Sequence, residues 1–381
     1  MERLAAVIIE EIKEQGPITF KQFMERALYY PQLGYYNTAA AKIGKDGDFY
    51  TSSDVSSLFG EMLADQFAEM WHKLDKPNDF YLIECGAGKG VLARDILKRL
   101  KVYEELAEKL TYIIVEISPE MQEHQRKNLK SLMDSGISVS WSKSVAHIPD
   151  LIGGKKVTGC VFSNELLDAF PVHIVKQGET LKEVGISTNE LGEFVEILME
   201  PTTPALEQHL IKSEIKLEHE QIIEINLQAL EWLSDVANIM EYGYIVTIDY
   251  GYLAKELAAP HRHQGTLICY ENHQAIDNPY ENVGNRDITA HVNFSALISW
   301  GEELELKTLG YTNQGKFLLA MGIMEQLGQK SLFECSPSEI KRVQNAKKLV
   351  MPGGMGEMFK VLIQGKGING DALRLRGLSP F

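Results

Sequence analysis

The stretch Phe80-Tyr-Leu-Ile-Glu-Cys-Gly-Ala-Gly-Lys-Gly90 decides the fold of this chain. It opens with a short apolar run, which predicts a strand over residues 80–85, and it ends where residues 90–101 take up the apolar spacing of a helix. Its glycines let the backbone turn sharply and approach a ligand closely, and the first turn of the helix offers N–H groups that have no partner within the helix. The stretch therefore predicts a ligand-binding loop between a strand and a helix.

The spacing of Gly86, Gly88 and Gly90 narrows the class of ligand. The dinucleotide-binding fingerprint G-x-G-x-x-G requires a glycine or alanine at the position of Val91, and the P-loop requires lysine and then serine or threonine after its last glycine, where Val-Leu stands here. An acidic residue, here Glu84, followed by G-x-G-x-G is typical of S-adenosylmethionine-dependent methyltransferases. A carboxylate at this place suits the ammonium group of a methionine moiety, whereas it would repel a phosphate.

A second acidic residue, Glu116, closes the next predicted strand, which covers residues 111–117. Ligands in open α/β sheets lie outside the carboxyl ends of the strands, and a carboxylate there can accept both hydroxyls of a ribose. Taken singly, the glycines are also consistent with a plain tight turn, and Glu84 with a solvated acid. With strand, loop, helix and second acid in this order, we predict S-adenosyl-L-methionine as the cofactor, bound by the two acids and the glycines.

Polar residues follow the third apolar run, residues 157–163, in the order Asn164-Glu165-Leu-Leu-Asp168. In methyltransferases of this fold the methyl acceptor usually meets the cofactor at this edge. If the segment is helical, the carboxylates of Glu165 and Asp168 share one face, and such a pair can hold a planar guanidinium by bidentate hydrogen bonds. We predict Asn164, Glu165 and Asp168 as the catalytic residues. In the alternative interpretation, Asp168 braces the turn and only one acid faces the site.

A long polar loop covers residues 33–57 and contains glycines, tyrosines, serines and threonines. Long loops inside a globular chain are commonly functional. We predict that the part of this loop from residue 47 to residue 57 closes over the cofactor and that Thr51 and Ser52 bind it, together with Asp48.

Strands alternate with helices along the chain, which predicts a mostly parallel, doubly wound α/β sheet with an N-terminal helical segment. Further strands are predicted at residues 244–248 and 359–363, and further helices at residues 2–14, 20–30, 55–74, 119–133 and 336–350. Residues 174–240 are predicted to be an inserted α+β segment with a Glu-rich helix over about 205–240. We predict two domains: residues 1–78, with the N-terminal helices and the cofactor-capping loop, and residues 79–381, with the catalytic sheet and the insertion.

The composition limits the possible partners. The chain has 381 residues, is 44% apolar and carries a formal net charge of −15, with no basic run that could neutralise phosphates, which disfavours nucleic acid as a partner. A basic peptide or protein surface suits this charge better. The 4 cysteines form no C-x-x-C pair, and the histidines lack the spacing of ligands, so no metal is predicted.

The N-terminal sequence predicts the location. Residues 1–13 are amphipathic, turn acidic early and lack the basic start and the small-residue cleavage site of a signal peptide. No stretch reaches the roughly 18 apolar residues that a membrane span needs. We therefore expect a cytoplasmic protein without a membrane span, and its oligomeric state is left open.

Several motifs taken together resemble the MidA-like family. They occur here in the family's order, at residues 47–53, 57–60, 84–90, 164–171, 248–251, 265–267, 287–294 and 356–361, and the resemblance spans about residues 16 to 365. The chain departs from the family at two places. The family's loop often reads Glu-Leu-Gly-Pro-Gly-Arg-Gly, against Cys85, Ala87 and Lys89 here, and the family often has aspartate where Asn293 stands.

The resemblance implies a class I methyltransferase fold, which is Rossmann-like, with extra helical and inserted segments. The mitochondrial members of the family include an arginine methyltransferase that assists assembly of respiratory complex I, so the resemblance also implies a protein substrate with arginine as the acceptor. Two other functions stay open. An assembly factor or chaperone would bind a partner without catalysis, which the acidic composition and the insertion favour and the intact glycine loop disfavours. A nicotinamide-dependent oxidoreductase is disfavoured by Val91.

Overall fold

The computed structural model describes residues 3–38, 56–271, 274–327 and 336–379. The chain forms two compact units, each assembled from separate stretches of sequence. The first unit contains residues 1–49, 167–232 and 251–300, and the second unit contains residues 50–166, 233–250 and 301–381. Neither unit begins at residue 79, and a functional division of the chain at that residue stays a prediction.

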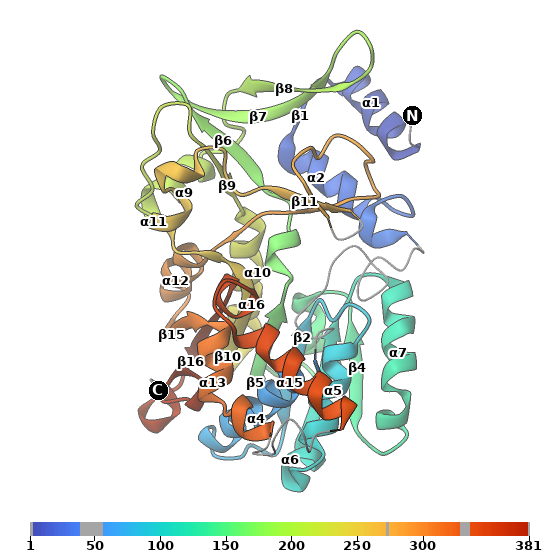
Figure 1. The fold of residues 1–381 in the computed structure, drawn as a ribbon, viewed down its shortest axis with the longest axis vertical. Helices are drawn as coiled ribbons and strands as arrows, with labels where there is room; N and C mark the ends of the chain where they lie inside the picture. Colours follow the sequence, from blue (N-terminus) through green and yellow to red (C-terminus); the bar gives the residue numbers. More distant parts are fainter. Residues whose placement is uncertain (1–2, 39–55, 272–273, 328–335, 380–381) are drawn as a thin grey trace. The chain divides into compact units, whose positions relative to one another are not determined.

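The second unit is built on a mixed sheet whose strands follow the order β15-β16-β10-β5-β2-β3-β4 (Figure 1). The parallel strands are β2 (Phe80–Cys85), β3 (Leu110–Val115), β4 (Ser138–Ser142), β5 (Val157–Asn164) and β10 (Met240–Tyr252). At the other edge, β16 (Phe359–Lys366) is antiparallel to both β10 and β15 (Leu306–Asn313). The register aligns Cys85 with Val115 and with Ser163, so the carboxyl ends of β3, β2 and β5 meet at one edge. The predicted α/β sheet is confirmed.

Helices connect these strands. In the described part of the second unit they are α4 (Ser57–Lys73), α5 (Val91–Leu100), α6 (Glu104–Lys109), α7 (Pro119–Met133), α8 (Ile148–Leu151), α13 (Gln314–Ala320), α14 (Ile323–Gln326), α15 (Pro337–Val350) and α16 (Met355–Met358), and α10 (Leu227–Ile239) crosses the boundary between the units. Local signals set where they begin: Ser56 caps α4, and Ser118 caps α7 ahead of Pro119. Across the described ranges, no helix combines the length and the apolar content that crossing a membrane requires.

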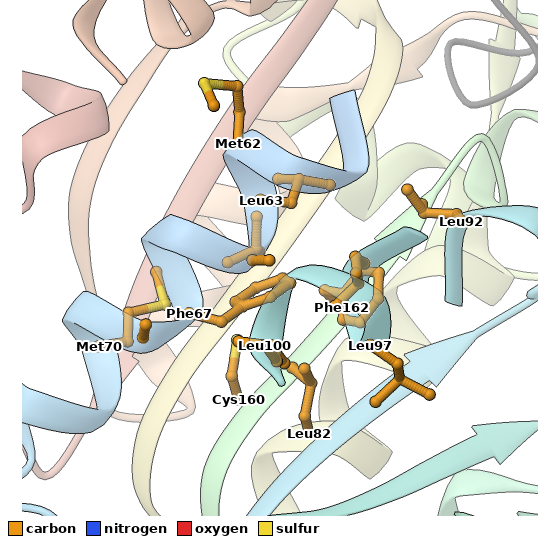
Figure 2. Packing of buried hydrophobic residues seen from close by; sticks show 14 of the residues in the cluster. Met62, Leu63, Phe67, Met70, Leu82, Leu92, Leu97, Leu100, Cys160 and Phe162 are labelled. Atoms are coloured by element: carbon orange, nitrogen blue, oxygen red, sulfur yellow. The ribbon is translucent and has the colours of Figure 1, made fainter. Parts of the chain in front are cut away.

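The core of the second unit lies where α4 packs near α5 and the sheet (Figure 2). Phe67 of α4 and Phe162 of β5 are fully buried, with ring centroids 5.0 Å apart and planes inclined by 41°. Gly60 lets α4 approach α5 closely, because a Cβ at that position would stand 2.8 Å from the Cβ of Asp95. This close packing holds α5, and with it the end of the glycine loop, in a fixed place.

The first unit joins the N-terminal segment to the predicted insertion. Its antiparallel sheet has the order β1-β7-β6-β9, with β8 paired to β7; the strands are β1 (Ile18–Thr19), β6 (His173–Gln177), β7 (Leu181–Thr188), β8 (Phe194–Met199) and β9 (Ile222–Ile225). β1 pairs Ile18 with Ile186, and α1 (Arg3–Gln15) and α2 (Phe20–Tyr29) share a core with the inserted strands. The N-terminal helices are therefore part of the same unit as the insertion.

The remaining elements of the first unit come from residues 251–300. A small sheet in the order β12-β11-β13 consists of β11 (Ile268–Glu271), β12 (Gln274–Ile276) and β13 (Asp287–Thr289). β14 (Val292–Asn293), α11 (Ala254–Leu257) and α12 (Phe294–Glu303) complete this stretch, and α9 (Ala205–Lys212) comes from the insertion.

Most predicted helices are confirmed, as α1, α2, α4, α5, α7 and α15. The long helix predicted over about residues 205–240 is wrong: the structure has α9 and α10 with β9 between them. The short run Ile222–Ile225 becomes a strand because it pairs with β6, Ile223 opposite Val175. β4 was not predicted, since three of its five residues are serine and only pairing with β3 makes them a strand.

Candidate functional site

The loop between β2 and α5 has the backbone conformation that its glycines permit. Gly86, Gly88 and Gly90 have φ angles of 75°, 50° and 76°, in the left-handed region that other residues rarely adopt. The Gly90 amide donates to the Ala87 carbonyl at 2.8 Å, and the Gly86 amide donates to the Val115 carbonyl of β3 at 3.1 Å. The loop is a tight turn that leads into the first turn of α5, where backbone N–H groups lack partners within the helix.

Glu84 lies near the end of β2 and is buried, with 2% of its surface exposed. The Tyr112 hydroxyl of β3 donates a hydrogen bond to Oε2 of Glu84 at 2.7 Å. Burial raises the pKa of Glu84 to about 7; the bond from Tyr112 acts against this rise, and the charge of Glu116 adds to it. A buried carboxylate gains most when a cation binds beside it, so Glu84 fits the ammonium group of a methionine moiety.

Glu116 follows β3 directly, and donors hold both oxygens of its carboxylate. The Ser118 amide donates to Oε1 at 2.9 Å, and the Gln125 side chain donates to Oε2 at 3.2 Å. Burial raises the pKa of Glu116, and these two bonds act against the rise. The carboxylate lies at the carboxyl edge of the sheet, the place at which such a residue can accept the hydroxyls of a ribose.

Ile117, the neighbour of Glu116, is a candidate site residue that sequence reasoning missed. It is apolar and yet 60% exposed. Beside the carboxylate that is predicted to bind a ribose, a side chain of this kind offers a surface that the flat, largely apolar face of a base would cover. It was overlooked because the predicted strand ran through residue 117, whereas β3 ends at Val115.

Three amide side chains on one face of α7 hold the two loops, and these residues were also missed. They are spaced by three along the helix, which places them on the same side. Each donates to a backbone carbonyl of the glycine loop or of the segment after β3: Gln122 to Glu116 at 2.8 Å, Gln125 to Gly88 at 2.7 Å and Asn128 to Lys89 at 2.7 Å. The sequence of α7 does not distinguish these three amides from its other polar residues, because their partners lie in other segments.

Asn164 and Glu165 leave the sheet at the end of β5, beside the glycine loop. Glu165 has a φ of 55°, a left-handed conformation that is strained for a residue other than glycine, and its amide donates to the Ile248 carbonyl of β10 at 2.9 Å. The Asn164 side-chain amide donates to Oε1 of Glu165 at 3.0 Å. The next residue, Leu166, lies so close to Gly86 that a Cβ there would stand 2.7 Å from its Cδ1. The Glu165 backbone is therefore adjacent to the predicted cofactor loop.

Asp168 belongs to the first unit. It is buried in the 3-10 helix Leu167–Ala169, which begins only after Glu165, so the helical spacing assumed for the two carboxylates is not present. Near Asp168, the Tyr36 hydroxyl donates to Oδ1 of Asp287 at 2.8 Å. Burial first, and then the charges of Asp287 and Asp168 among others, raise the pKa of Tyr36 well above its usual value. The pairing of Glu165 with Asp168 on one substrate group stays a prediction.

The remaining predicted positions divide into two groups. Thr51, Ser52 and Asp48, predicted to close over the cofactor, lie outside the residues that the structure describes. Asn293, where the family often has aspartate, caps α12: its Oδ1 accepts from the Ala296 amide at 3.1 Å. Because aspartate caps helices by the same bond, this departure is compatible with a conserved local structure.

The described residues of the second unit fit an adenosyl cofactor with an amino-acid end. A side chain on Gly90 would press on α7, since its Cβ would stand 3.2 Å from both Cα and Cγ of Gln125, and a Cβ on Gly86 would stand 2.7 Å from Cδ1 of Leu166. The loop thus keeps its backbone bare for a ligand, with one buried acid for an ammonium group and a second for hydroxyls. Such donors and acceptors on neighbouring strand ends match an amino acid joined to a nucleoside.

Comparison with protein families agrees with this geometry. A family model described as "Putative S-adenosyl-L-methionine-dependent methyltransferase" matches residues 62–312. Among curated proteins, "Protein arginine methyltransferase NDUFAF7 homolog, mitochondrial" of Drosophila melanogaster is 27% identical over 394 residues, covering 96% of this chain and 85% of that protein. "Protein arginine methyltransferase NDUFAF7, mitochondrial" of Bos taurus is 28% identical over 390 residues, covering 93% and 81%.

Solved structures give the same result at the level of the fold. The crystal structure of a COG1565 superfamily member from Burkholderia thailandensis bound to S-adenosyl-homocysteine matches with a TM-score of 0.85 at 32% identity, covering 98% of this chain and 94% of that chain. The native crystal structure of a COG1565 superfamily protein from the same organism matches with a TM-score of 0.85 at 31% identity, covering 99% and 94%.

Proposed function

Because this chain belongs to the Methyltransf_28 family of S-adenosyl-L-methionine-dependent methyltransferases, we propose that it methylates arginine side chains of a protein. The names of the curated relatives, protein arginine methyltransferases, support this acceptor. The observation that carries the proposal is the position of Glu165, which leaves the sheet in a strained conformation directly beside the glycine loop. Backbone strain at such a place is typical of a residue that is held for function.

The second unit supplies the residues that hold the cofactor. S-adenosyl-L-methionine contributes an electrophilic methyl group on a positively charged sulfur. The bare backbone of Gly86, Gly88 and Gly90 receives the amino-acid end, and Glu84 stabilises its ammonium group. Glu116 accepts hydrogen bonds from the ribose hydroxyls. Catalysis in this arrangement comes mainly from positioning, since both reactants are held before the methyl group moves.

Glu165 is the residue that acts on the acceptor. A free guanidinium stays protonated throughout the physiological pH range, so arginine arrives charged and one nitrogen must lose a proton during or after the transfer. The carboxylate of Glu165, oriented by the amide of Asn164, accepts hydrogen bonds from the guanidinium and aligns one nitrogen. That nitrogen gains the bond to the methyl carbon as the sulfur–carbon bond breaks, and Glu165 is the acceptor for the released proton. Asp168 stays the predicted second carboxylate.

The test uses the purified full chain with methyl-labelled S-adenosyl-L-methionine and an extract of cells that lack this protein. We expect label in protein, and methylarginine in the hydrolysate. Glu165→Gln is expected to bind S-adenosyl-homocysteine as the unchanged protein does and to lose transfer by at least about 100-fold, the scale of removing one group that acts only in the transition state. Label on another residue type, or full activity of Glu165→Gln, would overturn the acceptor or the role of Glu165.

Cofactor binding without any transfer would instead support the assembly-factor alternative. The cytoplasmic location, the absence of a nucleic-acid partner and the absence of a metal stay predictions.

A further inference from the structure

We propose that Gln125 of α7 is a positioning residue, which sets the Glu116 carboxylate and the glycine loop in one arrangement before the cofactor binds. The inference rests on the assignment of Glu116 to the ribose in the proposed function. Nothing in the sequence pattern singles out this glutamine, which lies in the middle of an otherwise ordinary helix. The case for it comes from three hydrogen bonds that the fold brings to one side chain.

Every polar atom of the Gln125 side chain has a partner, and the side chain is fully buried. Nε2 donates to the Gly88 carbonyl at 2.7 Å and to Oε2 of Glu116 at 3.2 Å. Oε1 accepts from Nε1 of Trp141, in β4, at 2.9 Å. One amide therefore joins the glycine loop, the Glu116 carboxylate and β4, the edge strand of the sheet.

The Trp141 bond decides which way the amide faces. An indole N–H can only donate, so the atom of Gln125 that faces Trp141 must be the oxygen. The two N–H groups are then directed at the Gly88 carbonyl and the Glu116 carboxylate, both of which can only accept. The hydrogen bond from Trp141 therefore fixes the Gln125 amide in the orientation in which it can bind both Gly88 and Glu116.

The neighbouring amides of α7 make a contrast within the same helix. Gln122 and Asn128 each donate to one backbone carbonyl and, in the described contacts, neither reaches the Glu116 carboxylate. Asn128 braces the glycine loop at Lys89, one residue from the carbonyl that Gln125 holds. Replacing Asn128 therefore removes a hydrogen bond to the glycine loop and leaves the contacts of the Glu116 carboxylate unchanged. This makes Asn128 the matched control.

Electrostatics gives Gln125 a second effect on Glu116. A donor to the charged carboxylate favours ionisation, which burial opposes, so loss of the donor raises the pKa of Glu116 further. The other charged groups nearby are Glu84 at the end of β2 and Arg126 on α7, whose guanidinium lies 4.7 Å from the centre of the Trp141 ring. A pH profile alone would mix Glu84 with Glu116, so the test uses the ribose instead.

The experiment compares the affinities of S-adenosyl-homocysteine and its 2′-deoxyadenosyl analogue, measured by calorimetry at one pH. The unchanged protein is expected to prefer the ribose form by about 10-fold or more, in line with about 1.4 kcal/mol for one hydrogen bond to a charged group. Gln125→Met, which keeps the length and removes the amide, should abolish most of that preference. Asn128→Leu should lower both affinities together and leave their ratio unchanged. Glu116→Gln should lose the preference, and adding Gln125→Met to it should remove nothing more.

A spectroscopic measurement and a second variant distinguish a role of Gln125 in positioning Glu116 from a role in folding. The Trp141 emission should shift in Gln125→Met, because its N–H loses its acceptor, and stay unchanged in Asn128→Leu. If Gln125→Met fails to fold, Trp141→Phe replaces it, since this change frees the amide to rotate and should reduce the ribose preference in part.

The outcomes distinguish the inference from its premise. If Glu116→Gln loses the ribose preference while Gln125→Met keeps it, Gln125 is a structural residue and the inference is overturned. If the unchanged protein binds neither ligand, or Glu116→Gln retains the full preference, the assignment of Glu116 itself fails.

Discussion

The phenol oxygen of Tyr112, in β3, lies 2.7 Å from Oε2 of Glu84, in the neighbouring strand β2, and both side chains are buried. Burial alone makes this carboxyl hard to ionise and raises its pKa to about 7, while the hydrogen bond favours the charged form. Burial also raises the pKa of Tyr112 itself well above its usual value, so the phenol remains a donor throughout the physiological range. With a pKa of about 7, Glu84 is near the balance between its neutral and charged forms, and a cation bound beside it would favour the charged form.

Replacing Glu84 should remove a pH dependence of stability. The pKa of Glu84 is about 7 in the folded protein against an ordinary 4.5, so the folded state holds the proton more tightly, and stability falls as the pH rises through this window. At about 1.4 kcal/mol per pKa unit, the loss is about 3 kcal/mol. Glu84→Gln lacks this loss. Urea unfolding of the ligand-free protein at pH 5 and pH 8 should show the variant gaining on the unchanged protein at the higher pH; parallel profiles would contradict the assigned pKa.

An alanine at Gly90 should weaken cofactor binding as well as the fold. The φ of Gly90 is 76° and that of Gly136 is 97°, so alanine at either position is strained by about 1 to 2 kcal/mol. Of these two positions, only Gly90 brings the new Cβ against a neighbour, Gln125 at 3.2 Å; at Gly136 no atom of the described residues lies within 4 Å. We expect both variants to lose stability through this strain, Gly90→Ala somewhat more through its contact, and only Gly90→Ala to bind S-adenosyl-homocysteine at least about 10-fold more weakly. Equal affinities in calorimetry would refute the link between loop shape and binding.

His209 should make the protein sensitive to acid. It is buried in α9, stacked on Trp300 with ring centroids 5.3 Å apart, and burial, with a smaller effect of Lys212, lowers its pKa to about 4. The unfolded chain takes up this proton near pH 6.5, so the contribution of His209 to stability is complete above that pH and is lost as the pH falls towards 4, by about 3 kcal/mol.

The measurement for His209 is the unfolding free energy at pH 7 and pH 4. His209→Phe keeps a ring against Trp300 and removes the titration. The variant should therefore lose less stability than the unchanged protein between these pH values. If the variant loses as much stability as the unchanged protein between pH 7 and pH 4, the pKa of His209 is not lowered in the folded protein.

Glycine at position 165 should separate stability from activity. Glu165 has a φ of 55°, which glycine adopts freely, so Glu165→Gly relieves strain of about 1 kcal/mol and should leave the fold as stable as before or slightly more so. The same change removes the carboxylate, and methyl transfer should fall as far as in Glu165→Gln. Unfolding and labelling assays on the two variants check this, and a clear loss of stability in Glu165→Gly would show that the carboxylate braces the fold.

Much of the second unit could be predicted because its signals are local. The apolar run of β2, the glycines after it and the helical spacing of α5 lie within one short stretch, and each obeys a period or a turn preference that needs no distant partner. The position of Glu84 and Glu116 at neighbouring strand ends could be predicted for the same reason, since parallel strands deliver their carboxyl ends to one edge.

The residues that sequence reasoning missed depend on distant partners. Gln125 is one of several polar residues on α7, and only the positions of Gly88, Glu116 and Trp141 give it a role. Ile222–Ile225 is too short for its period to be read, and pairing with β6 makes it a strand. Both failures have one cause, because hydrogen bonds between segments far apart in sequence leave no periodic trace in either segment.

The sequence by itself determined the strand–loop–helix unit, the acids at two strand ends and the alternation that builds the parallel sheet. Only the tertiary structure decided that the N-terminal helices join the insertion, through Ile18 paired with Ile186, and that a row of amides on α7 holds both the glycine loop and the segment after β3. The physical reason is that turns and periodic apolar faces are properties of adjacent residues. The partner of a strand edge or of a buried amide is set by whichever segment the whole fold brings within hydrogen-bond distance.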